Sequence, residues 1–537
     1  MSDTSKPSKA TTTPQLIRDA AAAYGDQIFL EENGQQLSFK AFDQLTDQVA
    51  RSVIAKGIQP GDRIGVWAPN VAEWIIAGLG LQRAGAILVT LNTRYKGNEA
   101  AQVLRSSGAK MVFVIGDFLG NDYPAMLDGF ELPELNDIIV LREGNTNTTE
   151  ASAANKSSWE AFLEVGAAIS DREANERVNA VKGSDTSDLL FTSGTTGAPK
   201  GVMTGHEQNL KTFANWGEIL GLEEGDRYLV ISPFFHSFGY KAGILVSLIY
   251  GVTLMPHDVF DAEAILKRIQ DEKVTVLPGP PTIFQTLLAC PTLAQYDISS
   301  LKRATTGAAA IPVEMIHKMK DLLGFDRILT AYGLTESCGL VTICRDGDSP
   351  ETIATTSGRA IPDVELRCVD GNNQPVPSGE AGEIVVRGYN VMQGYFENQA
   401  ATDEAIDSDG WLHTGDVGIL DENGNLRITD RLKDMFISGG FNCYPAEIEN
   451  AIANHPDVAM SAVIGIEDER MGEVGMAYIV LKTGIEMNSK TFISWCRDNM
   501  ANYKTPRQVR FVDALPLNAT GKVMKPELKK MAAAEQQ

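Results

Sequence analysis

Short apolar segments alternate with helix-like segments through most of this chain. Residues 63–68 and 86–91 are two of the apolar segments, and residues 71–82 between them have the pattern of a helix. Further strand-like runs lie at residues 111–115, 138–141, 228–231, 274–277 and 328–331. Strands that are apolar on both faces and alternate with helices are typical of parallel sheets with helices on both sides. The pattern therefore predicts an α/β fold, in which ligands bind at the carboxyl ends of the strands.

The pattern changes twice toward the C-terminus. Residues 383–387 and 426–429 alternate like antiparallel strands, with a hairpin turn at Asn423-Gly424. A new series then begins, with helices at 446–453 and 491–499 and strands at 460–465, 476–481 and 509–512. Because 537 residues exceed what one core accommodates, we expect more than one domain. The predicted units are a disordered tail (1–14), a large N-terminal domain of parallel-rich sheets covered by helices with a small β subdomain (15–431), and a small mobile α+β domain (432–537).

The net charge of −23 and the isoelectric point of about 4.8 restrict the partners of this chain. An acidic surface repels the phosphates of nucleic acids and of anionic lipids, so we expect no nucleic-acid partner. An anionic small molecule would need cations supplied locally. Such a patch can act against the overall charge because salt screens charges beyond roughly 8 Å.

Cysteine spacing and hydropathy indicate a cytoplasmic protein without a membrane span. The six cysteines form no C-x-x-C pair, which favours reduced thiols over disulfides or a zinc site. The longest apolar run, residues 242–256, is shorter than the ~20 residues that a membrane span requires. We expect Gly251 to divide it into a buried helix and a strand. Residues 1–14 contain no apolar stretch, so they do not predict a signal peptide.

Residues 191–201 read FTSGTTGAPKG and directly follow the apolar pair Leu189-Leu190. Glycines expose backbone N–H groups, and with Ser and Thr hydroxyls they can form a cradle for phosphate oxygens. The loop lacks the Gly-Lys-Ser/Thr of a Walker A sequence, and a proline precedes Lys200. Composition alone leaves a glycine- and threonine-rich surface loop as an equal alternative.

Residues 330–336, TAYGLTE, follow a predicted strand. Tyr332 offers a flat face suited to a purine, and Thr335 can donate to a phosphate oxygen. Glu336 is a hard oxygen ligand of the kind that Mg²⁺ prefers. A capped turn with a core tyrosine is the alternative for Tyr332.

Further motifs complete an ordered series. In residues 411–416, WLHTGD, the Asp416 carboxylate can accept hydrogen bonds from both ribose hydroxyls, although an aspartate here can also be a turn residue. Residues 430–434, DRLKD, lie at the domain boundary, where a solvated linker is the alternative. Residues 438–442, SGGFN, allow close approach of the backbone to a ligand. Lys522 ends PLNATGK near the C-terminus.

In content and order these motifs resemble those of the adenylate-forming superfamily, which includes acyl-CoA synthetases, firefly-type luciferases and adenylation domains. The resemblance covers nearly the whole chain from about Leu16. It implies an AMP-forming acyl-CoA synthetase that uses ATP, Mg²⁺ and coenzyme A. Two alternatives stay open: an enzyme that loads a carrier protein, and a non-catalytic nucleotide-binding or acyl-binding relative. The resemblance leaves the oligomeric state open, with a homodimer as one possibility.

The resemblance also implies roles for individual residues. The catalytic set comprises Lys522, Glu336, Thr335 and His236, with Glu336 and Thr192 at the metal. The set that binds ATP and AMP comprises Thr192, Ser193, Gly194, Thr195, Thr196, Lys200, Gly307, Ala308, Ala309, Tyr332, Gly333, Thr335, Asp416, Arg431 and Lys522. The set that binds coenzyme A comprises Ser438, Gly439, Gly440 and Phe441. Lys433 is the expected hinge of the small domain.

The acyl pocket is expected from residues 232–240, SPFFHSFGY, and residues 306–310, TGAAA. The residues that bind the acyl group are predicted to be Phe235, His236, Tyr240, Gly307, Cys338 and Gly339. His236 is either a gate or oxyanion contact, or a core histidine. The aromatic residues favour only an apolar acid. The resemblance of residues 233–244, 275–282 and 430–445 to bacterial acyl-CoA ligases implies either a medium- or long-chain fatty acid or an alicyclic propanoate derived from a steroid ring. Lys241 meets either a ring ketone of such an acid or a neighbouring acidic residue.

Overall fold

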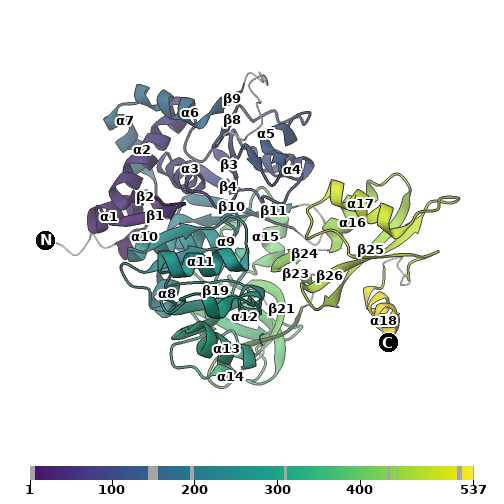
Figure 1. Cartoon of the computed structure of the whole chain (residues 1–537). Helices are drawn as coiled ribbons and strands as arrows, with labels where there is room; N and C mark the ends of the chain where they lie inside the picture. The colour runs from purple at the N-terminus through teal and green to yellow at the C-terminus, as the bar shows by residue number, and fades with distance from the viewer. Residues whose placement is uncertain are drawn as a thin grey trace.

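The computed structural model describes residues 7–142, 155–193, 199–307, 311, 313–431, 436–443, 445–516 and 523–535. A large domain packs beside a smaller C-terminal one, which lies at the right of Figure 1. The predicted tail is wrong from Pro7 onward. A 3₁₀ turn, η1 (Pro7–Lys9), precedes helix α1 (Thr13–Tyr24), and the Thr12 side chain caps α1 by accepting a hydrogen bond from Gln15 N.

The central sheet of the large domain contains most of the predicted apolar strands. The strand order is β20 (Gly394–Tyr395), β11 (Pro199–Gly205), β10 (Thr186–Ser193), β4 (Ile87–Thr90), β3 (Arg63–Trp67), β5 (Met111–Val114), β8 (Asp137–Val140) and β9 (Lys156–Ser158). Strands β3, β4, β5 and β8 are parallel, and β10 joins β4 in parallel while β11 returns antiparallel to β10. The parallel prediction is confirmed for this sheet.

Two further sheets stand beside it. One has the order β12 (Arg227–Val230), β13 (Thr253–Pro256), β1 (Ile28–Glu32) and β2 (Gln35–Ser38), and the other β14 (Arg303–Gly307), β15 (Arg327–Tyr332), β16 (Thr342–Ile343) and β17 (Arg359–Ala360). The strand predicted at residues 274–277 is wrong. Only Val276 pairs there, through single bridges to Tyr228 and Arg303, so it links the edges of the two sheets.

Helices cover these sheets (Figure 1). Those of the large domain, besides α1, are α2 (Phe39–Ala55), α3 (Ala72–Arg83), α4 (Gly97–Ser107), α5 (Tyr123–Met126), α6 (Trp159–Val165), α7 (Asp171–Ala180), α8 (His206–Leu220), α9 (Ser237–Gly239), α10 (Val246–Tyr250), α11 (Ala262–Glu272), α12 (Pro281–Leu288), α13 (Val313–Leu323), α14 (Pro350–Thr355) and α15 (Gln399–Ala405). The short helical turns are η2 (Gly166–Ala168), η3 (Tyr240–Leu245), η4 (Leu293–Gln295) and η5 (Thr335–Ser337), of which η3 is a π-helix. A small hairpin pairs β6 (Asp117–Phe118) with β7 (Asn121–Asp122).

The long apolar run divides where the sequence predicts. Helix α10 ends at Tyr250, Gly251 caps it in the left-handed conformation with φ of 70°, and β13 follows. Glycine is favoured at such a cap because it has no Cβ to clash. Among the described residues, no helix combines the length and apolarity needed to cross a membrane.

The β subdomain is an antiparallel meander, as predicted. Its strands are β18 (Val364–Val369), β19 (Ala381–Gly388), β21 (Leu412–Leu420) and β22 (Leu426–Arg431). Gly424, with φ of 78°, lies in the turn between the last two strands. The register set by this turn shifts by one residue between Val417 and Gly418, and this shift places Asp416 on β21 opposite Arg431 on β22.

The small domain has one sheet with helices on both faces. Its elements are β23 (Phe436–Ser438), β24 (Phe441–Cys443), α16 (Pro445–Ala453), β25 (Val458–Asp468), β26 (Gly472–Leu481), α17 (Ser489–Asn499), β27 (Gln508–Phe511) and α18 (Lys525–Glu535). Two separate apolar clusters result. One contains Ile448 of α16 and Phe492 of α17, and the other contains Leu528 of α18. The sheet therefore separates two faces, each with its own apolar cluster.

Because the side chain of His206 is buried, we expect the protein to lose stability in mild acid. His206 is 1% exposed, and its Nδ1 lies 2.9 Å from Thr13 Oγ1, which ties α8 to α1. Burial lowers the pKa of His206 from 6.5 to about 4, and the charges of Asp188 and Asp185 offset this only in part. Between these two pKa values the unfolded chain binds more protons than the folded one, so stability falls as the pH falls. The linkage between proton binding and folding gives a decrease of about 2 kcal/mol in the free energy of unfolding between pH 7 and pH 5.

The measurement is the thermal midpoint at pH 7 and at pH 5. The variant His206→Asn keeps an acceptor for Thr13 but has no group that titrates in this range. Its midpoint should fall less between the two pH values than that of the wild type. An equal fall in both proteins would show that other groups cause the acid sensitivity.

Candidate functional site

The predicted phosphate loop connects two strands of the central sheet. β10 and β11 form a hairpin in which Thr192 is paired with Lys200. The loop thus begins at the carboxyl end of β10, where α/β folds bind ligands. Gly194, Thr195 and Thr196 lie outside the described residues, as does the side chain of Ser193.

Tyr395 links this hairpin to Glu336. Tyr395 lies on β20, opposite Val202 of β11, and its hydroxyl donates a 2.9 Å hydrogen bond to Glu336 Oε1. Lys200 Nζ lies 4.9 Å from the centre of the Tyr395 ring. Burial raises the pKa of Glu336, while a backbone hydrogen bond, Tyr395 and the Lys200 charge act in the opposite direction. Two distant predicted residues therefore lie in one electrostatic environment. Sequence reasoning missed Tyr395, because β20 has only two residues and no motif marks it.

The predicted nucleotide-binding residues of the next motifs also converge. The Tyr332 hydroxyl, at the end of β15, donates a 2.8 Å hydrogen bond to Asp416 Oδ2 on β21. Asp416 N donates to Thr414 Oγ1, which fixes the local turn. Arg431 is the strand partner of Asp416, although its side chain lies outside the described part. An aromatic ring and a carboxylate thus lie together where β15 ends.

Glycines in these motifs are required by close backbone contacts. A Cβ on Gly307 would lie 2.4 Å from Ala331 O, and one on Gly333 would lie 2.3 Å from Gly339 O. Gly307 pairs with Ala331 across β14 and β15, so its strand end adjoins that of Tyr332. Thr335 begins the 3₁₀ turn η5 that contains Glu336. Ala308 and Ala309 lie outside the described residues.

His236 is not a core histidine, because its side chain is accessible to solvent, although protein surrounds it closely. Burial and, secondarily, the Lys241 charge lower its pKa to about 4. Nδ1 accepts a hydrogen bond from Phe238 N at 3.2 Å, so the neutral ring has its proton on Nε2. At neutral pH His236 is therefore an uncharged N–H donor.

Two of the residues predicted to contact the acyl group are fully buried in this arrangement. Tyr240 and Cys338 are 0% exposed, so neither presents surface to a ligand. The Tyr240 hydroxyl accepts a 2.9 Å hydrogen bond from Gln82, and burial raises the pKa of the Cys338 thiol to about 12. Phe235 and Gly339 retain accessible surface.

Lys241 meets an acidic neighbour, the second of the two predicted alternatives. Its Nζ lies 3.0 Å from Asp188 Oδ1, and both side chains are 0% exposed. Thr204 Oγ1, 2.9 Å from Nζ, also donates to Asp188. Because Asp188 is on β10, this pair joins the π-helix η3 to the strand that leads into the phosphate loop. A charge paired in this way has no role at a ring ketone.

The predicted coenzyme A segment forms a tight turn in the small domain. Ser438 and Phe441 are paired across β23 and β24, with Gly439 and Gly440 between them at φ of 56° and 84°. Two positive φ angles in a two-residue loop favour glycine. Gly440 faces Pro280 of the large domain, since a Cβ added to Gly440 would lie 3.7 Å from the Pro280 ring. We call residues 438–441 the glycine turn. Lys433 and Lys522 lie outside the described residues.

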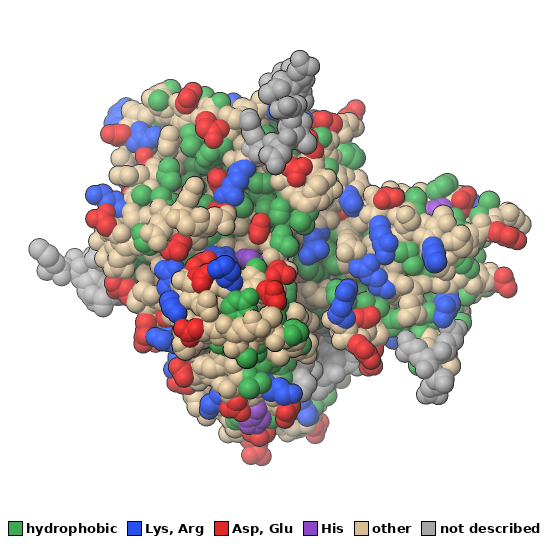
Figure 2. Space-filling view, viewed as in Figure 1, with side chains coloured by type: hydrophobic (Ala, Val, Ile, Leu, Met, Phe, Trp, Pro, Cys, Tyr) green, Lys and Arg blue, Asp and Glu red, His purple; other side chains and the backbone are tan. Residues whose placement is uncertain are grey.

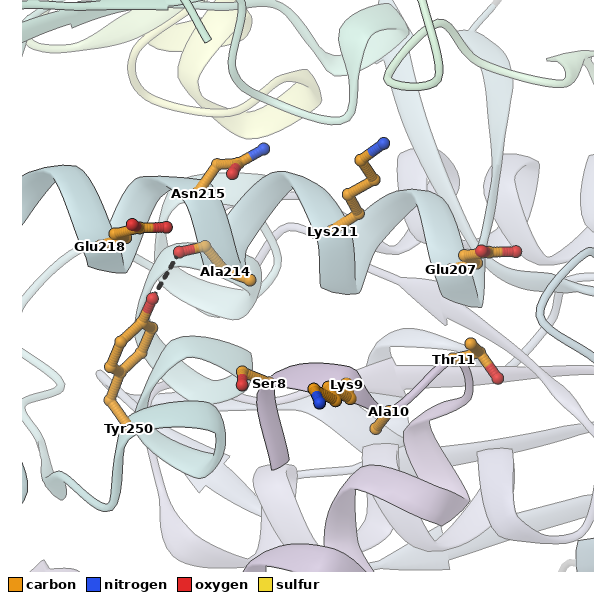
Figure 3. Close-up of a pocket in the computed structure, with 10 residues that line it drawn as sticks. All are labelled: Ser8, Lys9, Ala10, Thr11, Glu207, Lys211, Ala214, Asn215, Glu218 and Tyr250. Atoms are coloured by element: carbon orange, nitrogen blue, oxygen red, sulfur yellow. Dashed lines mark hydrogen bonds between the residues drawn. The ribbon is translucent and has the colours of Figure 1, made fainter. Parts of the chain in front are cut away.

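A pocket elsewhere on the molecule contains none of the predicted site residues. It is a surface cavity of about 550 Å³ between the N-terminal segment and α8, shown in Figure 3. Tyr250 closes one end through a 2.6 Å hydrogen bond to Ala214 O. Its lining mixes charges of both signs, from Lys9, Lys211, Glu207 and Glu218.

Comparison with known proteins identifies the family. The model described as "AMP-binding enzyme" matches residues 17–396, and the one described as "AMP-binding enzyme C-terminal domain" matches residues 447–522. The chain belongs to the AMP-binding enzyme family, the adenylate-forming superfamily that its motifs resemble, and is an AMP-forming acid–CoA ligase within it.

Two relatives share one name, 3-[(3aS,4S,7aS)-7a-methyl-1,5-dioxo-octahydro-1H-inden-4-yl]propanoyl:CoA ligase. The protein from Rhodococcus jostii is 46% identical over 96% of this chain and 98% of its own length. The protein from Mycobacterium tuberculosis is 48% identical over 90% of this chain and 91% of its own length.

Among solved structures, o-succinylbenzoate CoA synthetase from Bacillus subtilis is 27% identical in sequence. A double mutant with a bound product analogue gives a TM-score of 0.80, covering 96% of this chain and 98% of that one. The same enzyme with its acyl-adenylate intermediate gives 0.65, covering 96% and 97%. The folds agree. The difference between the two scores accompanies a difference in bound ligand.

Proposed function

We propose that this ligase activates a bicyclic propanoate in two half-reactions at the site described above. In the first, a carboxylate oxygen of the acid attacks the α-phosphorus of ATP, and the bond to the bridging oxygen breaks to release pyrophosphate. In the second, the thiolate of coenzyme A attacks the acyl carbon of the adenylate. AMP leaves, and the thioester remains.

The nucleotide roles follow the convergence of the motifs. Tyr332 supplies a face for the adenine, and Asp416 and Arg431 hold the ribose and the α-phosphate. The hairpin loop of β10 and β11, with Thr192 and Lys200, encloses the phosphates. His236, as an uncharged donor, contacts the carboxylate of the acid without trapping it as an ion pair.

The donor set near Glu336 fits Mg²⁺. Among the described residues, no cluster of three or more His, Cys, Asp or Glu side chains is arranged to hold a metal. Mg²⁺ typically takes one or two carboxylates and completes its shell with water and substrate phosphates. Glu336 and Thr192 are the residues that would hold it. When bound, the ion offsets negative charge on the phosphates.

The small domain supports a change of orientation between the half-reactions. Phe441 of the glycine turn packs with the apolar cluster of α16 and α17. Leu515 and Val523, which flank the segment of Lys522, pack with the cluster of α18 on the other face of the sheet. In any one orientation of the small domain, therefore, either the glycine turn or the segment of Lys522 faces the large domain. Here the glycine turn faces it, and the higher similarity to the product-analogue complex agrees with a thioester-forming arrangement.

Cations on the small domain support the binding of an anionic cosubstrate. Figure 2 shows several Lys and Arg side chains on this domain close to the junction with the large one. They lie on a protein whose net charge is −23. A local patch of this kind is what coenzyme A requires on an acidic protein. Cytoplasmic location and homodimer formation stay predictions.

The substrate class rests on one observation: the two relatives that share the bicyclic name are 46% and 48% identical over nearly the whole chain. An accessible Phe235 and an uncharged His236 suit an apolar acid. Lys241 gives no support for the bicyclic substrate, because its ammonium group is paired with the carboxylate of Asp188.

The test is a panel of acids assayed for AMP release with ATP, Mg²⁺ and coenzyme A. The bicyclic propanoate should exceed a medium-chain fatty acid in kcat/KM by ~10²-fold or more, since rings and chains differ by several buried methylenes. Comparing pyrophosphate release with and without coenzyme A separates a CoA ligase from an enzyme that loads a carrier protein, because coenzyme A sustains turnover only in the ligase. A preference for straight chains would end the bicyclic assignment. Absence of AMP with every acid would favour a non-catalytic relative.

A further inference from the structure

A buried lysine of the small domain bridges the two domains. Lys504 is 3% exposed, and its Nζ lies 2.8 Å from Glu99 Oε1 on α4 of the large domain. The same Nζ lies 2.5 Å from Glu447 Oε1 on α16 of the small domain. The ring of Tyr95, also from the large domain, has its centre 4.8 Å from Nζ. One cation thus contacts a carboxylate from each domain and an aromatic face.

The neighbouring contacts connect this lysine to the glycine turn. Tyr503 accepts a 3.1 Å hydrogen bond from Asn92 Nδ2 of the large domain. On the other side its ring stacks on Phe441 at 4.6 Å between centres. The Arg94 guanidinium lies 5.2 Å from the centre of the Phe441 ring. The contacts of Lys504 and those of the turn therefore form one interface.

The two carboxylates differ in how they depend on domain orientation. Glu447 belongs to the same rigid unit as Lys504, so their contact persists wherever the small domain turns. Glu99 belongs to the large domain, so its contact exists only in the arrangement seen here. Burial by itself lowers the pKa of Lys504, but Tyr503, Glu447 and Glu99 outweigh it and raise the pKa well above its ordinary value. The lysine is therefore charged, and it needs partners when it is buried.

We propose that Glu99 is a positioning residue whose ion pair with Lys504 stabilises the domain arrangement that forms the thioester. The proposal rests on the two half-reactions of the proposed function. A contact made in one arrangement and absent from another shifts the balance between them by its free energy. Glu99 therefore favours the second half-reaction without touching any substrate.

The variant Glu99→Gln isolates this role. Glu99 Oε2 also accepts a 2.9 Å hydrogen bond from Lys96 N and so caps α4. Glutamine keeps that capping acceptor and removes the charge. Thioester formation, started from synthetic acyl-adenylate and coenzyme A, should slow by about tenfold, within the usual range of couplings between domain states. Adenylation, followed as pyrophosphate release with hydroxylamine, should stay unchanged or rise.

Glu447→Gln is the matched control, because it neutralises the other partner of the same lysine within one domain. It should leave the ratio of the two rates near that of the wild type, whatever it does to thermal stability. The proposal is overturned if Glu99→Gln leaves the ratio unchanged, or lowers both rates equally. A wild-type protein that forms no AMP with any acid would instead refute the proposed function, so the two failures are distinguishable.

Discussion

Replacing Glu336 with glutamine is expected to slow adenylation by ~10²–10³-fold, the scale of one preorganised charge-stabilising group. Glutamine is nearly isosteric and keeps an oxygen that can accept the 2.9 Å hydrogen bond from Tyr395. Only the negative charge is lost, and with it the carboxylate expected to hold Mg²⁺. The measurement is pyrophosphate release as a function of Mg²⁺ concentration. The variant should need more Mg²⁺ for half-maximal rate as well as having a lower maximum.

Tyr395→Phe is the matched control for this prediction. It removes the hydrogen bond to Glu336 but leaves the carboxylate in place, so its effect should be much smaller. Because Tyr395 lowers the pKa of Glu336, its loss should move the acid limb of the pH–rate profile to higher pH. In the wild type the acid limb should lie at higher pH than it would for an exposed glutamate, since burial raises the pKa of Glu336. An unchanged Mg²⁺ dependence in Glu336→Gln would remove Glu336 from the metal site.

Local patterns predict those features of the site that lie within single segments. The apolar strands, the break at Gly251 and the turn at Gly424 follow from short-range rules on burial and positive φ, and the structure confirms them. The loop between β10 and β11 is predicted to bind phosphate from its glycines and hydroxyls together with its place in the ordered series of motifs. The strand that was predicted wrongly, at residues 274–277, has the same apolar composition as the others, yet only Val276 pairs with a neighbouring strand. Pairing depends on neighbours that composition does not specify.

Long-range partners are not predictable from those patterns. Lys241 and Tyr240 have the sequence of a pocket wall, but η3 turns them toward Asp188 and Gln82, and both become fully buried. Tyr395 acts through a partner 59 positions away, and Lys504 through one 405 positions away. Neither pair has a sequence signal, because each depends on how separate sheets and domains pack.

Replacing Lys522 with alanine is expected to slow adenylation by ~10²–10³-fold and to leave thioester formation almost unchanged. Attack on the α-phosphorus concentrates negative charge, and a placed ammonium group offsets it. In the proposed mechanism the second half-reaction uses the glycine turn instead, and Phe441 of this turn packs with the opposite apolar cluster of the small domain. The two steps should therefore respond to different residues of that domain. Pyrophosphate release and thioester formation from synthetic acyl-adenylate measure them separately.

The control is Lys529→Ala, which removes an exposed lysine from α18 in the same C-terminal region. It should alter neither rate, since an exposed charge far from the phosphates is screened. Comparison with Glu99→Gln gives the sharper test. Lys522→Ala should impair the first step and Glu99→Gln the second, because one residue acts on charge at phosphorus and the other on domain orientation. If Lys522→Ala slowed both steps alike, a single fixed arrangement would serve both half-reactions, and neither residue would act by way of domain rotation.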